Sequence, residues 1–200
     1  ASIKGLVDKA MADGMPGIAL TDHGSMFGIK EFFDYVNKKN GPLLRERKDL
    51  KKQIKALEEQ EERSAEDEAK LSELREQLQA AEAKPLFKPI LGCEVYCARR
   101  SRFKKDANVP NPYRPNQSVD NSGWHLVLLA KDLTGYKNLI KMVSRSWIDG
   151  YYYRPRIDKE LLEAHHEGII ASSACLGGEI PQHIMYGNID EAEKSIEWRS

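Results

Sequence analysis

Hydrophobic positions at the start of the chain recur with helical spacing. They follow Ser2, a favourable N-cap, so we predict a helix that ends at Gly14. The run Gly17–Thr21 is predicted to be a strand, and Gly24 turns the chain into a second amphipathic helix. The apolar positions of that second helix are Ile29, Phe32, Phe33 and Val36. A helix, a strand and a helix in succession are typical of an α/β fold.

The pattern changes between Pro42 and Lys84, where aromatic residues and glycine are absent. Two leucine-rich stripes with helical spacing occupy this segment, and between them Ser64 and Asp67 form a capping-box pattern. The stripes are Leu43, Leu50, Ile54 and Leu57, and Leu71, Leu74, Leu78 and Ala81. We therefore predict an antiparallel helical hairpin, residues 42–84, inserted between residues 1–41 and 85–200 of one domain. Its nearly balanced charge favours a solvated coiled-coil-like insertion over a DNA-binding arm.

In the remainder of the chain, residues 85–200, we predict strands and helices in alternation. Strands are predicted at Pro89–Cys97, His125–Ala130 and Gly168–Ser172, and Thr134 is predicted to cap a helix. A shorter helix is marked by Leu161 and Leu162, and the polar segment 99–121 is predicted to be a long loop.

Composition narrows the function classes. The formal net charge of the 200 residues is zero and there are three cysteines, none in a Cys-x-x-Cys motif, so we expect reduced thiols rather than a disulfide framework. We find no membrane-spanning apolar run and no signal peptide, which predicts a soluble cytoplasmic protein without a membrane partner. Glycine-rich nucleotide loops are absent, which excludes kinases and dinucleotide enzymes.

One basic cluster contains an aromatic residue. It consists of Arg99, Arg100, Arg102, Lys104 and Lys105, with Phe103 among them. Zero net charge gives no sign of a nucleic-acid-binding protein, so any DNA contact would be local. A solvated loop and a phosphate contact both remain open for this cluster.

Potential metal ligands stand at or near strand-like runs. They are His23 with neighbouring Asp22, Glu94, His125 and Cys175. Imidazole, carboxylate and thiolate are the ligand types that zinc prefers. Each residue also has an ordinary structural interpretation: a helix cap beside a surface histidine, an edge-strand carboxylate, a core histidine and a small buried thiol. No single one of these positions decides between the two interpretations.

Together the segments resemble the polymerase and histidinol phosphatase (PHP) domain of bacterial replicative polymerases, the DNA polymerase III alpha subunits of the C family. The segments that carry the resemblance are Ala19–Gly28, Lys88–Tyr96, His125–Ala130 with Gly135–Leu139, Tyr153–Asp158 and Cys175–Pro181. The resemblance covers nearly the whole chain except the hairpin. It implies a distorted (β/α)7 barrel, here incomplete, with up to three divalent metal ions above it.

By that resemblance His23, Glu94, His125 and Cys175 match metal-binding positions for zinc or manganese, and Asp22 is a neighbour that orients a ligand. The resemblance also leads us to expect a His-x-His pair upstream of Ala1 and an acidic-x-His pair beyond Ser200, so that the chain is a fragment of a longer polymerase. No residue for polymerisation is expected here, because the Mg²⁺-binding aspartates belong to a palm domain elsewhere.

The implied activity is metal-dependent phosphoester hydrolysis of the 3′–5′ exonuclease type. The alternative is a noncatalytic module that docks a separate proofreading exonuclease subunit. A free-standing small-molecule phosphatase is disfavoured by Tyr153–Asp158 and by Cys175–Glu179, which resemble the polymerase branch. The implied partners are DNA, the exonuclease subunit and other subunits of the replicative holoenzyme.

Overall fold

The computed structural model describes residues 2–60 and 62–198. The chain divides into two compact units, Ala1–Ile18 with Lys30–Pro89, and Ala19–Ile29 with Ile90–Ser200. Among the described residues, no helix combines the length and the hydropathy needed to cross a membrane.

The first unit begins with α1 (Ile3–Ala12), whose N-cap is the predicted Ser2. The Ser2 hydroxyl accepts a hydrogen bond from the Gly5 N–H at 3.1 Å, which satisfies one of the free donors of the first turn. Val7 and Ala10 are buried. Gly14 follows the helix at φ +72°, a left-handed conformation that favours glycine and ends the helix.

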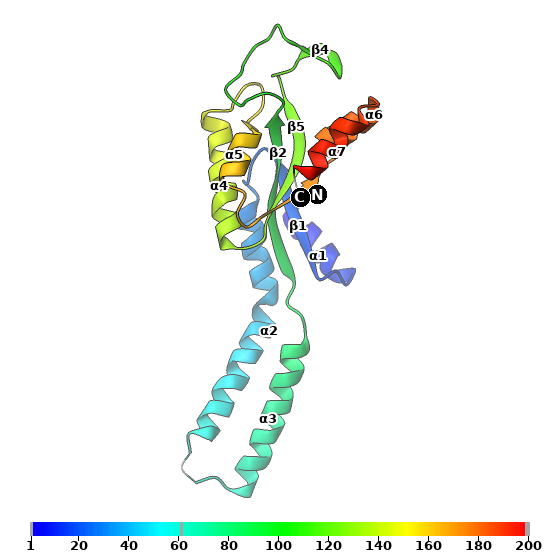
Figure 1. Ribbon diagram of the computed structural model, residues 1–200. Helices are drawn as coiled ribbons and strands as arrows, with labels where there is room; N and C mark the ends of the chain where they lie inside the picture. Colours follow the sequence, from blue (N-terminus) through cyan, green and yellow to red (C-terminus); the bar gives the residue numbers. More distant parts are fainter. Residues whose placement is uncertain (1, 61, 199–200) are drawn as a thin grey trace. The chain divides into compact units, whose positions relative to one another are not determined.

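Beyond α1, this unit holds α2 (Ile29–Glu58), which joins the helix predicted at Ile29–Val36 to the first arm of the hairpin predicted from Pro42, and α3 (Ala65–Ala83), the second arm. The two run antiparallel (Figure 1), and both leucine stripes meet in one hydrophobic cluster. The capping box of Ser64 and Asp67 is present in both directions. Arg47 donates from Nε and Nη2 to the carbonyl oxygen of Ala81 at 3.1 and 3.0 Å, so a cation meets the negative end of the α3 dipole.

Helix α2 continues through Pro42 without interruption. Proline inside a helix lacks an N–H donor and normally bends or ends the helix. Contacts on both sides of Pro42 hold the helix here. Asn40 donates to the Phe87 carbonyl at 2.9 Å and accepts from the Phe87 N–H at 3.1 Å, while Leu43 packs against the hairpin cluster.

A mixed sheet organises the second unit, which confirms the α/β class. Its path is β1 (Gly17–His23), β2 (Lys88–Ala98), β5 (Gly123–Ala130) and β7 (Ile169–Ser173), and β6 (Arg156–Ile157) pairs with β2. β2 with β5 and β5 with β7 are antiparallel, whereas β6 is parallel to β2. In the described residues this path is open, with β1 and β7 at its ends.

The two faces of the sheet carry different residues. Cys93, Val95 and Cys97 alternate along β2 and point into the core, together with Leu126 and Leu128 of β5. Helices α4 (Leu133–Ile148) and α5 (Lys159–Ala164) cover this core face (Figure 1). Because side chains alternate across a strand, Glu94, Tyr96 and His125 belong to the opposite face.

Several details differ from the sequence predictions. The α4 helix is capped by Asp132, not by Thr134: the Asp132 carboxylate accepts from the Gly135 N–H at 2.9 Å. The predicted loop 99–121 contains a small antiparallel pair, β3 (Pro110–Asn111) and β4 (Arg114–Ser118). Helices α6 (Glu179–Met185) and α7 (Ile189–Glu197) were not predicted. Neither has a side-chain cap, and the buried residues of α7, Ala192 and Ser195, are small.

Candidate metal centre

Strand register brings Glu94 and His125 together. His125 lies opposite Tyr96, and Glu94 lies opposite Val127, so Glu94 and His125 are diagonal neighbours on the same face of β2 and β5. The Nδ1 atom of His125 is 2.9 Å from Oε1 of Glu94. The Tyr96 ring meets the His125 ring edge to face at 5.1 Å. The carboxylate and the tyrosine therefore fix the imidazole between them.

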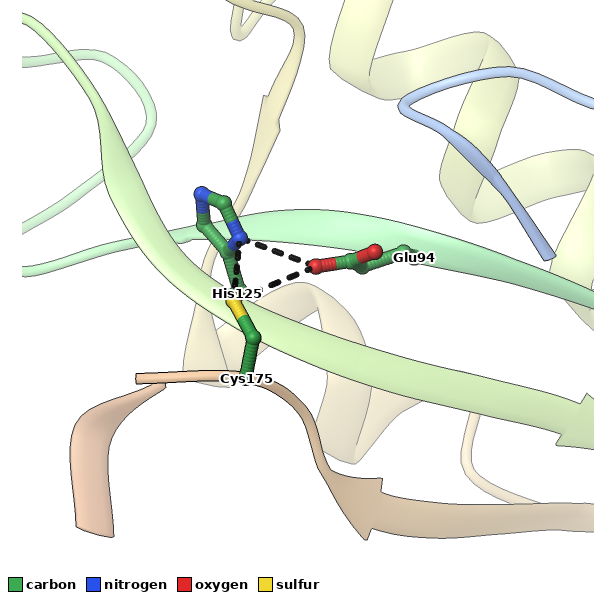
Figure 2. A group of neighbouring side chains, drawn as sticks. All are labelled: Glu94, His125 and Cys175. Atoms are coloured by element: carbon green, nitrogen blue, oxygen red, sulfur yellow. Dashed lines mark hydrogen bonds and ion pairs between the residues drawn. The ribbon is translucent and has the colours of Figure 1, made fainter. Parts of the chain in front are cut away.

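The loop after β7 places Cys175 beside this pair. The backbone N–H of His125 donates to the Gly177 carbonyl at 3.0 Å, which holds the loop against β5. A Cβ at Gly177 would lie 3.1 Å from the His125 ring, so glycine permits the close approach. The Sγ of Cys175 is 3.3 Å from His125 Nδ1 and 3.9 Å from Glu94 Oε1, as Figure 2 shows.

His23 approaches the same carboxylate from the end of β1. Its Nδ1 lies 3.1 Å from Oε2 of Glu94, so each oxygen of Glu94 faces a different imidazole. The His23 side chain is 66% exposed, against 26% for His125 and 15% for Glu94. All four predicted ligand positions thus converge, with His23 at the solvent side.

The donor set fits a metal ion. One nitrogen, one oxygen and one sulfur, from His125, Glu94 and Cys175, lie within 4.8 Å of one another. Donor atoms around one tetrahedral zinc ion are about 3.4 to 3.6 Å apart, which follows from the usual metal–ligand bond lengths. The observed separations of 2.9, 3.3 and 3.9 Å bracket that range, so small side-chain adjustments would complete the geometry.

The neighbouring Cys93 is not part of this set. It points into the core, and burial raises the pKa of its thiol to about 12. Its Sγ donates to the carbonyl oxygen of Asp22 at 3.4 Å. Cys93 therefore stays protonated and helps hold β2 against β1.

Asp22, next to His23 in the chain, holds the turn that follows β1. Its Oδ2 accepts from the Gly28 N–H at 3.1 Å, which stabilises the turn before α2. The turn itself depends on Gly24, at φ +62°, where a Cβ would meet Pro155 Cγ at 2.7 Å. Asp22 and Gly24 thus fix the backbone on both sides of His23.

The basic cluster is largely engaged within the molecule. Arg99 stacks over Trp124 at 4.1 Å, and burial lowers the pKa of its guanidinium to about 10. Arg100 forms an ion pair with Asp120. The buried Arg102 pairs with Asp158 at 2.7 Å. Lys104 and Lys105 are exposed.

Sequence reasoning missed the function of Arg156 in this region. Arg156 is fully buried and donates to backbone carbonyls of Asp120, Arg102, Lys104 and Gly150 at 2.7 to 3.0 Å. It thereby anchors the segment that follows β2. The sequence signal for Arg156 was its place in the motif Tyr153–Asp158, which marks the residue but does not reveal its hydrogen-bond partners.

Comparison with known proteins identifies the family of the chain. The family described as the PHP domain matches residues 1–199. The chain is 34% identical to DNA polymerase III subunit alpha of Borreliella burgdorferi over 198 residues, which are 99% of this chain and 12% of that protein.

The subunits of the same name from Thermus aquaticus and Treponema pallidum are also 34% identical, over 90% and 96% of this chain and 10% and 12% of theirs. The chain therefore spans about a tenth of the length of these relatives. With the match across residues 1–199, it belongs to the PHP domain family.

Proposed function

We propose that this chain is the PHP module of a bacterial replicative DNA polymerase and that it hydrolyses phosphoester bonds with the help of divalent metal. The observation that carries the proposal is the convergence of Glu94, His125 and Cys175, with His23 next to them, from three strands and one loop. Three donor types at one point are uncommon in a purely structural arrangement, because a carboxylate and a thiol gain little from each other.

The donor chemistry favours zinc over manganese. A cysteine thiolate is a soft ligand that suits zinc, whereas manganese prefers oxygen. Glu94, His125 and Cys175 would hold the ion, and His23 lies beside the other carboxylate oxygen of Glu94. Bound divalent metal supplies Lewis acidity and lowers the pKa of a bound water.

The protein residues have separate tasks in this proposal. Glu94 holds both imidazoles in orientation, and Tyr96 restricts the His125 ring. The Gly177 N–H donates to Cys175 Sγ at 3.4 Å, which helps to hold the sulfur beside His125 and Glu94. Because His23 and Cys175 are exposed, the centre is open to solvent. An open centre suits a polymer end such as a DNA 3′ terminus better than an enclosed small metabolite.

The names of the relatives support the wider assignment. We infer a place in bacterial DNA replication in the cytoplasm, with DNA, a proofreading exonuclease subunit and other holoenzyme subunits as partners. We also infer that the sheet is part of a PHP-type barrel and that residues 42–84 are an insertion between two parts of the domain.

Metal content tests the proposal. We expect elemental analysis of the purified chain to find bound zinc, and we expect Cys175→Ser to weaken zinc binding by at least about tenfold. Cys93→Ser is the matched control, since it alters a thiol next to Glu94 but on the other face of the sheet. Release of a 3′-terminal nucleotide from single-stranded DNA should fall with the zinc content. Equal zinc affinity in both variants would contradict the assignment of Cys175, and a chain that binds no metal would favour the noncatalytic docking role.

A further inference from the structure

The exposed face of α4 combines lysines with apolar and aromatic side chains. Ile140, Trp147 and Ile148 are 41%, 46% and 74% exposed. Lys137 and Lys141 stand on the same side at helical spacing, and neither forms an ion pair with a residue of 2–60 or 62–198. The helix contains no acidic residue. This face is therefore positive as well as apolar.

A cavity lies between this face and the turn that follows β1. Its volume is about 420 Å³, within the range of small-molecule pockets of about 300–1,000 Å³. It is lined by Ser25, Met26 and Phe27 from the turn, and by Ile140, Ser144 and Trp147 among the residues of α4. Phe27 is 86% exposed. We call this space the α4 cavity.

The α4 cavity adjoins the candidate metal centre through one residue. The Gly24 N–H donates to the carbonyl oxygen of Glu94 at 2.8 Å. The carbonyl oxygen of Gly24 accepts from Nε1 of Trp147 at 2.9 Å. Gly24 directly follows His23, so a ligand of the centre and a wall of the cavity are attached to the same turn.

We propose that the α4 cavity binds an unpaired base of single-stranded DNA while Lys137 and Lys141 contact its phosphates. Aromatic side chains bind bases of any sequence by stacking, and cations beside them follow the backbone. Paired bases in a duplex do not present their faces, so the cavity selects single strands. The unpaired lysines and the lack of acidic residues on α4 favour a polyanion over an apolar protein segment.

This inference rests on the proposed function, because the cavity would hold the strand whose end enters the metal centre. It differs from the DNA contact that the sequence left open for the segment 99–105, where the arginines already have partners within the molecule. Base binding itself requires no metal, so the two proposals can fail separately.

Fluorescence anisotropy with a short labelled oligo(dT) tests the inference on the complete 200-residue chain. We expect Phe27→Ala and Trp147→Ala each to weaken binding by about 5- to 100-fold, the usual effect of removing one stacking residue. Trp147→Phe keeps a ring and loses the hydrogen bond to Gly24, so it should retain most of the affinity. Leu133→Ala is the control, because Leu133 is a 66% exposed residue of α4 that does not line the cavity.

The salt dependence of the DNA affinity tests whether Lys137 and Lys141 contact phosphates. Each phosphate contact with a single strand contributes about 0.7 to the slope of log K against log salt, so replacing Lys137 and Lys141 with Gln should reduce that slope by about 1.4. An unchanged slope would show that the two lysines do not contact the DNA phosphates.

Three outcomes would overturn the proposal. Wild-type affinity in both Phe27→Ala and Trp147→Ala would show that the cavity holds no base, and a different occupant such as a protein segment would then cover it. Equal affinity for duplex and single strand would exclude base insertion. Loss of binding in Cys175→Ser together with wild-type binding in Phe27→Ala would assign DNA binding to the metal centre alone.

Discussion

Replacing Arg156 with Met should destabilise the fold strongly, although Arg156 touches neither the metal centre nor solvent. The guanidinium donates to backbone carbonyls of Gly150 at 3.0 Å, Asp120 at 2.7 Å, Arg102 at 2.9 Å and Lys104 at 3.0 Å. Methionine fills a similar volume but leaves these acceptors buried without that donor, and each orphaned acceptor costs roughly 1–3 kcal/mol.

Part of that loss is offset, because methionine has no charge to bury. Burial lowers the pKa of Arg156, and the carboxylate of Asp120 opposes the shift, so the wild-type residue already carries a desolvation penalty. The net loss should be about 3–5 kcal/mol, because several buried carbonyl oxygens lose their donor while the desolvation penalty of the guanidinium disappears. This is a large share of the roughly 5–15 kcal/mol that stabilises a typical domain.

Urea unfolding followed by far-ultraviolet circular dichroism measures the change. Arg154→Met is the matched control: Arg154 is exposed and lies two residues upstream, and its guanidinium lies 5.8 Å from the centre of the Tyr96 ring. Its free energy of unfolding should fall by no more than about 0.5 kcal/mol, as is usual for surface substitutions. A loss below about 1 kcal/mol in Arg156→Met, or equal losses in both variants, would refute the reasoning.

Two further predictions concern acid stability and the turn after β1. Burial alone would raise the pKa of Asp158, but hydrogen bonds from Arg102 and other donors outweigh it and hold the pKa below its ordinary value. This contribution to stability is present above the unfolded pKa of about 3.9 and is lost as pH falls through the lowered folded pKa. Asp158→Asn should therefore reduce the fall in the free energy of unfolding between about pH 5 and pH 2. Parallel plots of that free energy against pH for the two proteins would contradict this. In thermal unfolding, Gly24→Ala should destabilise the chain by about 2 kcal/mol more than Gly14→Ala. Both positions have positive φ, but only at Gly24 would a Cβ collide with a neighbour, Pro155 Cγ at 2.7 Å. Equal losses would show that the backbone strain of positive φ matters and the collision does not.

Local signals in the sequence were reliable where the chain interacts with itself over short distances. The caps at Ser2 and Ser64 and the leucine stripes of the hairpin all appear as predicted. The start of α4 was misplaced by two residues, since Asp132 and Thr134 are both acceptable caps and only the backbone geometry selects one. Helix α7 escaped prediction because small residues, Ala192 and Ser195, form its buried side.

The basic cluster shows the limit of such signals. Arg100 and Arg102 look alike in sequence as exposed cations of a polar loop. Their partners Asp120 and Asp158 lie 20 and 56 residues further along the chain. Nothing in the local pattern distinguishes a cation that will bind a phosphate from one that will pair with a distant carboxylate.

The sequence by itself determined the main helices and strands, the capping box of the hairpin and the chemical identity of the candidate ligands, because periodicity, capping and donor type depend on residues close together in the chain. Only the tertiary structure decided that Glu94 and His125, 31 residues apart, and Cys175, 50 residues further on, would meet. Strand register sets that meeting, and a shift of one residue would turn Glu94 into the core. The α4 cavity has the same origin, since its walls come from a turn and a helix that are far apart in the chain and are joined by the hydrogen bond from Trp147 to Gly24.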